Sequence, residues 1–420
     1  MARVLLLLPA AGYRNDDFLS AAQKLNVEVI AAADYCHRLA PLMGMSPILS
    51  LPFDRPVIAL QQALVSLGRR VDAVLAVDDH GLELAALLRE KLGLPGNPPQ
   101  AVRATRDKLA FRQLLDSNGF NCPHFQAAWS ETDPTALASS LHYPVVVKAR
   151  RLCASRGVVR ADDAASFVGA VTQVRRIQAS ADREAAQLGL IVEEFIPGTE
   201  YALEGLLESG GLRVLALFDK PDPLDGPYFE ETIYVTPSRL PAHKQTAIAR
   251  DVERACAVAG LASGPVHAEV RVNDQGIWLL EVAARSIGGL CGRMLIHRLG
   301  MPLEELILRD ALGMPIAPPA NDEAAGVMMI PIPGRGIFLR ANGLEAARAV
   351  PGVHDIRITA QTGQLVAPPP EGSGYLGFIF CRAAAPQAAE AALRAAHAKL
   401  DLDIRADLPL ARDRAQRVAR

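Results

Sequence analysis

The segment from His267 to Gly289 (HAEVRVNDQGIWLLEVAARSIGG) constrains the fold most, because it sets two acids on a strand, a turn and a second strand. Its first residues alternate between two faces, Asn273–Gly276 has turn chemistry, and Ile277–Val282 has the pattern of a return strand. We therefore expect Glu269 and Glu281 to face each other across a hairpin. Two ionised carboxylates this close repel unless a cation lies between them, and a hard divalent cation is the usual solution. The alternative is an ordinary amphipathic hairpin with two exposed acids.

Four further patterns precede the hairpin. TRDK opens a helix, with Thr105 as its expected N-cap. YPVVVKAR predicts a buried strand that delivers Lys148 at its far end, and a small loop follows from Cys153 to Val158. IVEEFIPGTEYALEGLL predicts an apolar strand, a turn at Pro197-Gly198 and a second strand. Each pattern alone is weak evidence, but their order along the chain is specific.

Three of these positions suit the binding of a polyphosphate. An ammonium group on a flexible stem, as in Lys108 and Lys148, is a mobile point charge, and Lys148 emerges at a strand end, where α/β sheets bind ligands. The turn Ser155-Arg156-Gly157 has backbone amides that could approach phosphates closely. The alternatives are solvated surface lysines and a plain hairpin turn.

In this order, the patterns from Ala104 through Glu281 resemble the ATP-grasp superfamily. The resemblance implies an ATP-grasp fold, α/β and α+β, with an N-terminal doubly wound parallel-sheet domain, a small lid subdomain and a C-terminal α+β domain. It implies ATP and Mg²⁺ or Mn²⁺, with Glu269 and Glu281 as metal ligands. Other contacts implied by the resemblance involve Lys108, Lys148, Ser155, Arg156 and Gly157 at the phosphates, the strand backbone at Glu193, Glu194 and Ile196 at the adenine, and Glu200 at the ribose. Glu193 and Glu194 would also fit two neighbouring strand residues on opposite faces, only one of which can enter the cleft.

One departure from the common superfamily pattern points to a branch. Most members carry Glu-x-Asn, whereas this chain reads Glu281-Val282-Ala283. That motif resembles the L-amino acid ligases, carboxylate–amine ligases with Glu-x-Ala/Gly-Ala-Arg, in which the arginine is catalytic; Arg285 matches it. The stretch Pro227–Pro237 (PYFEETIYVTP) also resembles this branch, with Tyr234 in place of the usual histidine. That difference puts the amino-acid preference in question and leaves the reaction class unaffected.

The branch implies an ADP-forming ligase that joins two amino acids through an acyl phosphate, with Glu269, Glu281 and Arg285 as catalytic residues. Its partners would be small-molecule carboxylates and amines, and the resemblance also implies a homodimer formed through the N-terminal domain. Two alternatives remain open. A ligase or carboxylase for a purine precursor would need an additional basic cluster for the substrate phosphate, which the sequence does not display. A catalytically silent ATP-binding protein would fit Ala283, which replaces the amide ligand.

Composition excludes several classes of protein. With 420 residues, half of them hydrophobic, the chain can bury several cores and suggests two to four domains. A formal net charge of −2 gives no electrostatic footprint for nucleic acid or anionic lipid. The apolar start ARVLLLLPAAGY is shorter than a signal peptide requires and predicts a buried strand, and no segment is long enough to span a membrane. The cysteines lack Cys-x-x-Cys spacing, which predicts reduced thiols in a cytoplasmic protein rather than a zinc site or a disulfide scaffold; they are Cys36, Cys122, Cys153, Cys256, Cys291 and Cys381.

The order of the elements predicts four regions. The first hundred residues alternate strand and helix, which is typical of a parallel sheet. The loops that follow its first and third strands carry Tyr13 and Arg14, and Asp78, Asp79 and His80, as ligand-binding or as helix-capping residues. The predicted regions are 1–100, the N-terminal α/β domain; 101–190, a linker helix and the lid, with strands at 144–148 and 157–159 and a helix at 164–187; 191–318, the central catalytic subdomain, with helices at 244–259 and 303–311; and 319–420, the C-terminal α+β domain, with helices at 343–349 and 386–400.

Overall fold

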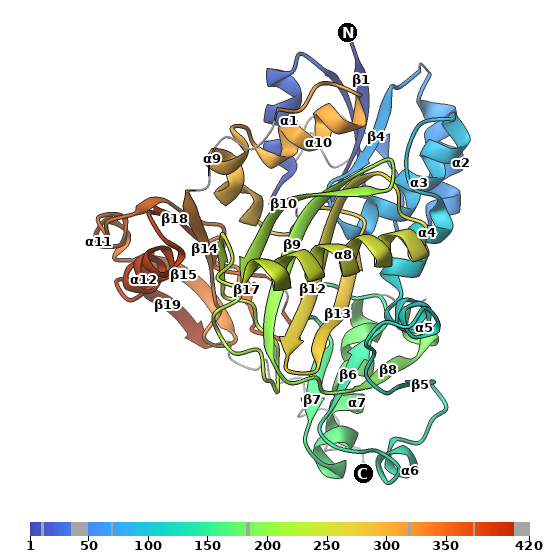
Figure 1. Cartoon of the computed structure of the whole chain (residues 1–420), viewed down its shortest axis with the longest axis vertical. Helices are drawn as coiled ribbons and strands as arrows, with labels where there is room; N and C mark the ends of the chain where they lie inside the picture. Colours follow the sequence, from blue (N-terminus) through green and yellow to red (C-terminus); the bar gives the residue numbers. More distant parts are fainter. Residues whose placement is uncertain are drawn as a thin grey trace, which may run out of the picture.

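The computed structural model describes residues 1–9, 12–34, 49–68, 70–181, 185–317, 321, 323–372 and 374–406. Within these ranges the chain forms four sheets, with the N-terminal domain at the top of Figure 1, the lid at the bottom and the C-terminal domain at the left. Three features of the sequence lie outside the described residues: Cys36, the predicted boundary between residues 318 and 319, and the Arg-rich tail after Leu408. No described helix combines the length and hydrophobicity that a membrane span would need.

The N-terminal domain is the predicted parallel sheet. Strand β1 is buried on both faces: Leu5 and Leu7 enter one core and Leu6 the other, as expected for a strand covered by helices on both sides. Only β3 was not predicted, because two residues give no periodicity. The strands, in sheet order, are β3 (Leu49–Ser50), β2 (Glu28–Ala33), β1 (Arg3–Leu8) and β4 (Ala73–Ala76), and the helices are α1 (Asn15–Lys24), α2 (Pro56–Ser66) and α3 (Leu82–Leu92).

The linker helices begin differently from the sequence prediction. Thr105, predicted as an N-cap, lies inside α4 (Pro99–Arg106), and its hydroxyl donates back to the carbonyl of Val102 at 3.2 Å. The N-cap of α5 (Lys108–Ser117) is Asp107, whose carboxylate accepts from two backbone N–H groups of the first turn. The prediction was wrong because Pro99 had already started a helix before Thr105.

The lid is an antiparallel sheet covered by a long helix. Helix α7 ends at Ala181, before the predicted end at residue 187, and strand β8 pairs with β5 and β6, so it completes this sheet and crosses the predicted border at residue 190. The strands, in sheet order, are β5 (Phe125–Ala128), β8 (Leu190–Glu194), β6 (Val145–Ala149) and β7 (Val158–Ala161), and the helices are α6 (Pro134–Ala138), α7 (Ala164–Ala181) and the 3₁₀ helix η3 (Ala185–Leu188).

An eight-stranded sheet connects the central and C-terminal regions. It begins with the predicted hairpin, and helix α8 covers the part of the sheet near β10 and β13 (Figure 1). Because β14, β18 and β16 complete it, one sheet spans both predicted regions. In order, its strands are β13 (Gly276–Ala283), β12 (Gly264–Asn273), β9 (Thr199–Glu208), β10 (Gly211–Asp219), β11 (Ile233–Thr236), β14 (Ala324–Ile330), β18 (Gly377–Ala383) and β16 (Val353–Ile358), and the helices near it are α8 (Ala242–Ala259), η4 (Cys291–Leu295), α9 (Ile296–Leu299) and α10 (Leu303–Ala311).

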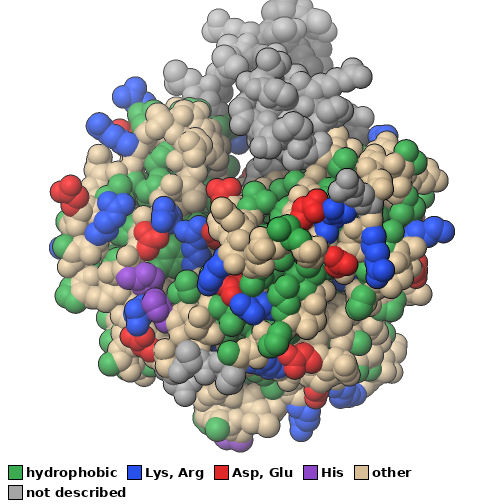
Figure 2. Space-filling view, turned by 90° about the horizontal axis from the view of Figure 1, so that it is seen from above, with side chains coloured by type: hydrophobic (Ala, Val, Ile, Leu, Met, Phe, Trp, Pro, Cys, Tyr) green, Lys and Arg blue, Asp and Glu red, His purple; other side chains and the backbone are tan. Residues whose placement is uncertain are grey.

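The C-terminal region adds a small sheet and two helices. Helix α12 packs on β14 and β18, and α10 of the central region packs on α1 of the N-terminal domain. The remaining elements are β17 (Leu365–Val366), β15 (Gly336–Asn342) and β19 (Asp401–Ala406), in that sheet order, with α11 (Leu344–Arg348) and α12 (Pro386–His397). On the face shown in Figure 2, basic and acidic side chains are interspersed, in line with the near-neutral net charge.

Candidate active site

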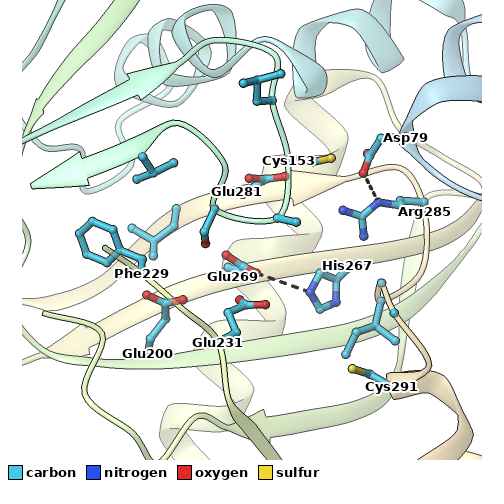
Figure 3. A pocket seen from close by; sticks show the side chains of 18 of the residues that line it. Asp79, Cys153, Glu200, Phe229, Glu231, His267, Glu269, Glu281, Arg285 and Cys291 are labelled. Atoms are coloured by element: carbon cyan, nitrogen blue, oxygen red, sulfur yellow. Dashed lines mark hydrogen bonds and ion pairs between the residues drawn. The ribbon is translucent and has the colours of Figure 1, made fainter. Parts of the chain in front are cut away.

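A cavity of about 330 Å³ lies where the lid, the central sheet, the N-terminal domain and the C-terminal domain meet. Its walls contain most of the predicted site residues, and Figure 3 shows several of them converging. Arg156 and Gly157 are not among the lining residues. Those predicted residues that line the cavity are Lys108, Lys148, Ser155, Glu193, Glu194, Ile196, Glu200, Glu269, Glu281 and Arg285.

The two predicted metal ligands face each other. Glu269 on β12 and Glu281 on β13 are directly paired in the hairpin register, and their side chains are 24% and 29% exposed. Lys220 Nζ lies 3.3 Å from Glu269, and Lys108 Nζ lies 3.6 Å from Glu281. Burial opposes ionisation of Glu269, but the charge of Lys220 and the contact with His267 together lower the pKa of this carboxyl group. Two accessible carboxylates, one of them clearly favoured in its ionised form, are a donor set that fits a hard divalent cation.

A second acidic cluster surrounds Lys220 and was missed in the sequence. Glu231 accepts from the Lys220 ammonium at 2.5 Å and Glu200 accepts from it at 2.7 Å. Carboxylate oxygens of Glu200, Glu231 and Glu269 lie within 4.8 Å of one another. Burial alone would lower the pKa of Lys220, but the acids around it raise that pKa well above its usual value, so the lysine stays charged. Glu231 lies in the PYFEETIYVTP stretch, so the sequence did contain a signal for it.

Glu200 has protein partners for both of its oxygens. Besides Lys220, Arg271 Nε lies 3.2 Å from its carboxylate, and the same guanidinium donates to the backbone carbonyl of Ile196 at 2.7 Å. A contact between Glu200 and a ribose stays a prediction. These bonds fix the end of β8 against β12 at the back of the cavity.

Glu193 joins the lid to the hairpin. Its carboxylate is 3% exposed and accepts from Lys148 Nζ at 2.5 Å and from Arg112 Nε at 2.8 Å. Arg112, which the sequence gave no reason to select, also donates to the carbonyl of Leu279 on β13 at 2.7 Å. Burial opposes ionisation of Glu193, but the two cations outweigh it and lower its pKa to about 2. The neighbouring Glu194 points to the other face and is exposed, while its backbone N–H donates to the carbonyl of His124 at 2.8 Å.

Replacing Glu193 with glutamine is expected to destabilise the fold by about 3–5 kcal/mol, since two buried cations lose their partner. The folded-state pKa of Glu193 lies below its unfolded value, so its stabilisation, about 3 kcal/mol, is present above pH 4.5 and is lost as the pH falls towards 2. The free energy of unfolding of the variant, measured by denaturant titration, should therefore vary less between pH 5 and pH 3. The control is Glu208→Gln, because Glu208 is a half-exposed partner of Arg213 and should cost under about 0.5 kcal/mol.

The predicted phosphate loop has an unusual backbone. Ala154 and Ser155 have positive φ angles of 53° and 55°, and Gly157 has φ 68°. The N–H of Arg156 donates to the carbonyl of Cys153 at 3.2 Å, and that of Gly157 to Pro370 at 3.3 Å, so both amides hold the loop in this conformation. Ser155 lines the cavity. The binding of phosphate by this loop stays a prediction.

Arg285 reaches the cavity from the end of the hairpin and is held by the N-terminal domain. Its Nε lies 2.7 Å from the carboxylate of Asp79, and its terminal nitrogen donates to the carbonyl of Ser286 at 2.9 Å. Burial opposes ionisation of Asp79, but Arg285 outweighs it and lowers the pKa of the carboxyl group. Asp78 caps the short 3₁₀ helix η2 (Asp79–Gly81) by accepting from the N–H of His80 at 3.0 Å. The two aspartates thus divide the predicted roles: Asp78 is a cap and Asp79 faces the cavity.

His267 connects Glu269 to the buried core, and sequence reasoning missed this role. Its Nδ1 lies 3.1 Å from Glu204, and its Nε2 lies 3.8 Å from Glu269 (Figure 3). Burial would lower the pKa of His267, but the two glutamates raise it to about 9. Glu204 is fully buried and also accepts from the N–H of Ile287 at 2.9 Å. One buried carboxylate thereby positions both the metal-facing strand and the segment that follows the hairpin.

The structure also bears on two further residues named in the sequence analysis, Cys153 and Tyr234. Cys153 lines the cavity, but burial raises its pKa to about 12, so its thiol is not activated as a nucleophile. Tyr234 is 2% exposed, and its ring stacks on Phe218 at a centroid distance of 5.7 Å. The Lys220 ammonium lies 5.2 Å from the centre of the Tyr234 ring, a cation–π contact that an imidazole would not make in the same way.

Comparisons with known families match two parts of the chain. An ATP-grasp domain model matches residues 141–294, and a model described as L-amino acid ligase C-terminal domain 2 matches residues 328–405. The first covers the lid from β6 onwards and the hairpin with both facing glutamates. The second covers the strands that extend the central sheet and the small C-terminal sheet.

Comparisons with individual proteins agree with these two domain matches. Carnosine synthase 1 of Gallus gallus is 30% identical over 63% of this chain and 30% of its own length, and alanine–anticapsin ligase of Bacillus subtilis (strain 168) is 24% identical over 63% and 60%. The chain thus spans about a third of the carnosine synthases that it matches. The crystal structure of an L-amino acid ligase from Bacillus licheniformis superposes with a TM-score of 0.79 and 26% identity, over 96% of this chain and 99% of that one. The chain therefore has an ATP-grasp fold, with an ATP-grasp domain at residues 141–294 and a match to the C-terminal domain of L-amino acid ligases at residues 328–405.

Proposed function

We propose that the chain is an ATP-dependent ligase that joins the carboxyl group of one amino acid to the amino group of another, through an acyl phosphate, and releases ADP and phosphate. The observation that carries the proposal is the pair Glu269 and Glu281, which face each other on the cavity wall with Lys108 and Arg285 beside them. Around one cavity, the two glutamates would serve as carboxylate ligands of a cation, Lys108 would bind phosphate, and Arg285 would donate to an oxyanion. The similarity to ligases that act on amino acids supports the choice of substrates.

The cofactor requirement follows from the donor set. Glu269 and Glu281 would hold Mg²⁺ or Mn²⁺, which would supply charge neutralisation to the β and γ phosphates of ATP. Lys108 at the start of α5 and Lys148 on β6 both line the cavity and would bind phosphate oxygens as point charges. Lys148 is oriented by Glu193, which keeps its ammonium at the cavity surface.

The residues define two chemical steps. In the first, the substrate carboxylate attacks the γ phosphorus, the bond to the β-phosphate oxygen breaks, and ADP leaves. In the second, the amine attacks the acyl carbon, a tetrahedral oxyanion forms, and phosphate departs as the amide is made. Arg285 would stabilise that oxyanion, and Asp79 holds its guanidinium in place before the charge develops. A homodimer stays a prediction.

A silent nucleotide-binding protein is the second candidate, because Ala283 replaces the amide ligand of the common motif. It predicts binding of ATP with Mg²⁺ without release of phosphate that depends on amino acids. A ligase for a purine precursor is disfavoured, because it would need an additional basic cluster for the substrate phosphate. Arg14 is the described cation that the N-terminal domain contributes to the cavity lining, and it is 4% exposed and bound to Glu304 at 2.8 Å.

The test is phosphate release by the purified protein with ATP and Mg²⁺, alone and with pools of amino acids, followed by mass spectrometry. Release that requires two amino acids, yields ADP and produces a condensed mass is the expected result. Binding of ATP without release in any pool would contradict the ligase and support the silent protein. Formation of AMP would contradict the acyl-phosphate route.

A further inference from the structure

One end of the cavity is apolar. Its lining combines Tyr13 from the loop after β1, Ile287 and Cys291 from the segment after the hairpin, Met329 on β14 and Tyr375 just before β18. The Cys291 sulfur lies 3.5 Å from that of Met329, and the N–H of Tyr375 donates to the Tyr13 hydroxyl at 3.3 Å. Three regions distant in the sequence therefore line one part of the cavity. We call the space beside these five side chains the apolar pocket.

The apolar pocket is held rigidly by the core beneath it. Tyr13 and Tyr375 both pack edge-on against Phe378, with ring centroids at 5.4 and 5.9 Å, and Phe378 is fully buried. Ile287, Cys291 and Met329 are each 2% exposed and belong to the same hydrophobic cluster. A wall of this kind keeps its shape when a ligand arrives, so it discriminates by size and polarity.

The apolar pocket adjoins the charged cluster around Lys220. In Figure 3, Cys291 lies near Glu231 and His267, at the end of the view away from Cys153. Burial raises the pKa of the Cys291 thiol, and the charge of Glu231 adds to that rise. Glu231 contacts Lys220, and Lys220 lies 3.3 Å from Glu269. A substrate whose side chain fills the apolar pocket would therefore have its main-chain groups beside the proposed metal and phosphate site.

We propose that the apolar pocket receives the side chain of the amino acid that is phosphorylated, and that it selects an apolar side chain there. The proposal rests on the ligase function proposed above. Transfer of apolar surface into this pocket is favourable in proportion to its area, whereas a charged or amide side chain would lose its water beside Ile287, Cys291 and Met329, whose side chains offer it no strong hydrogen-bond partner. Tyr375 and Cys291 limit the depth of the apolar pocket. Tyr375 bounds it from the C-terminal domain, and Cys291 bounds it from the segment after the hairpin.

The test isolates the first substrate by using hydroxylamine as the amine. Single amino acids are supplied with ATP and Mg²⁺, and formation of the amino-acyl hydroxamate is measured, so that only the carboxylate substrate varies. For the unmodified protein, kcat/KM for alanine, valine, leucine or methionine should exceed that for aspartate or lysine at least tenfold. Tyr375→Ala should shift the ratio of kcat/KM for phenylalanine over alanine at least tenfold towards phenylalanine, and Cys291→Met should shift it in the opposite direction.

A matched control separates pocket size from general damage. Tyr143 is also half-buried and packs edge-on against a phenylalanine, Phe167, at 6.5 Å, but it lies in the lid outside the cavity lining. Tyr143→Ala should keep the original preference. Because each result is a ratio within one variant, a loss of folded protein does not change it.

The outcomes distinguish this inference from the proposed function. An unchanged hydroxamate preference in both pocket variants would overturn the inference while leaving the ligase intact. The same conclusion would follow if the variants altered only the preference for the acceptor in dipeptide formation, because the apolar pocket would then belong to the amine. If no amino acid gave ATP-dependent hydroxamate, dipeptide or ADP, the ligase function itself would fail, and the inference would fail with it.

Discussion

Substitution of Glu281 with glutamine is expected to lower kcat at least about 10³-fold, equivalent to about 4 kcal/mol of transition-state stabilisation. The amide keeps the size of the side chain but removes the charge with which Glu281, together with Glu269, would hold a divalent cation. Glu281 is 29% exposed and its nearest cation, Lys108, lies at 3.6 Å, so the fold should not depend on it. Steady-state phosphate release and the melting temperature measure the two effects separately. Calorimetric titration with Mg²⁺ and ATP should show weaker metal-dependent binding.

The control for this substitution is Glu208→Gln, the half-exposed acid at the end of β9 used above for stability. It removes one charge from the same central sheet, outside the cavity, and should leave kcat within about twofold. Activity retained by Glu281→Gln would remove the metal assignment. A large drop in melting temperature would instead show that Glu281 stabilises the hairpin.

Replacement of Arg285 with lysine should lower kcat about 10²- to 10³-fold while the affinity for ATP changes little. A lysine ammonium cannot reproduce the planar fork, which uses Nε for Asp79 and a terminal nitrogen for the carbonyl of Ser286 and still faces the cavity. Asp79→Asn should lower kcat by a smaller factor, because Arg285 keeps its charge but loses its ionic partner. Single-turnover kinetics should assign both losses to the amide-forming step, with acyl phosphate still formed.

Arg293 provides a matched control for Arg285. It forms a bidentate pair with Asp17 at 2.7 and 2.9 Å, and it also joins the segment after the hairpin to the N-terminal domain. Arg293 does not line the cavity. Arg293→Lys should leave kcat nearly unchanged, so an equal loss in both variants would indicate a structural role for Arg285.

The prediction of the fold succeeded where the pattern was local. The alternating strand and the turn specify the hairpin, but the register that runs from Asn273–Gly276 to Val270–Leu279 would pair Glu269 with Leu280. A β-bulge between Glu269 and Val270 shifts the pairing by one residue, so that Glu269 faces Glu281. The apolar runs of β1 and β4 specify buried parallel strands in the same way. Local reasoning failed at Thr105, because the helix that contains it already begins at Pro99. It also failed at β8, because the sheet to which a strand belongs depends on the strands that pair with it.

The sequence by itself predicted the ATP-grasp fold, through the family resemblance that its ordered motifs carry. It also predicted the hairpin with the candidate metal ligands Glu269 and Glu281, through its alternation and turn chemistry. Only the tertiary structure decided what surrounds that pair. Lys220 and Glu231 come from the segment between β10 and β11, Arg112 from the linker helix and Asp79 from the N-terminal domain. Their roles depend on distances across the chain and on the loss of water around buried charges. Neither quantity is encoded in the spacing of residues along one segment, so a buried ion pair becomes recognisable only when both partners are placed in space.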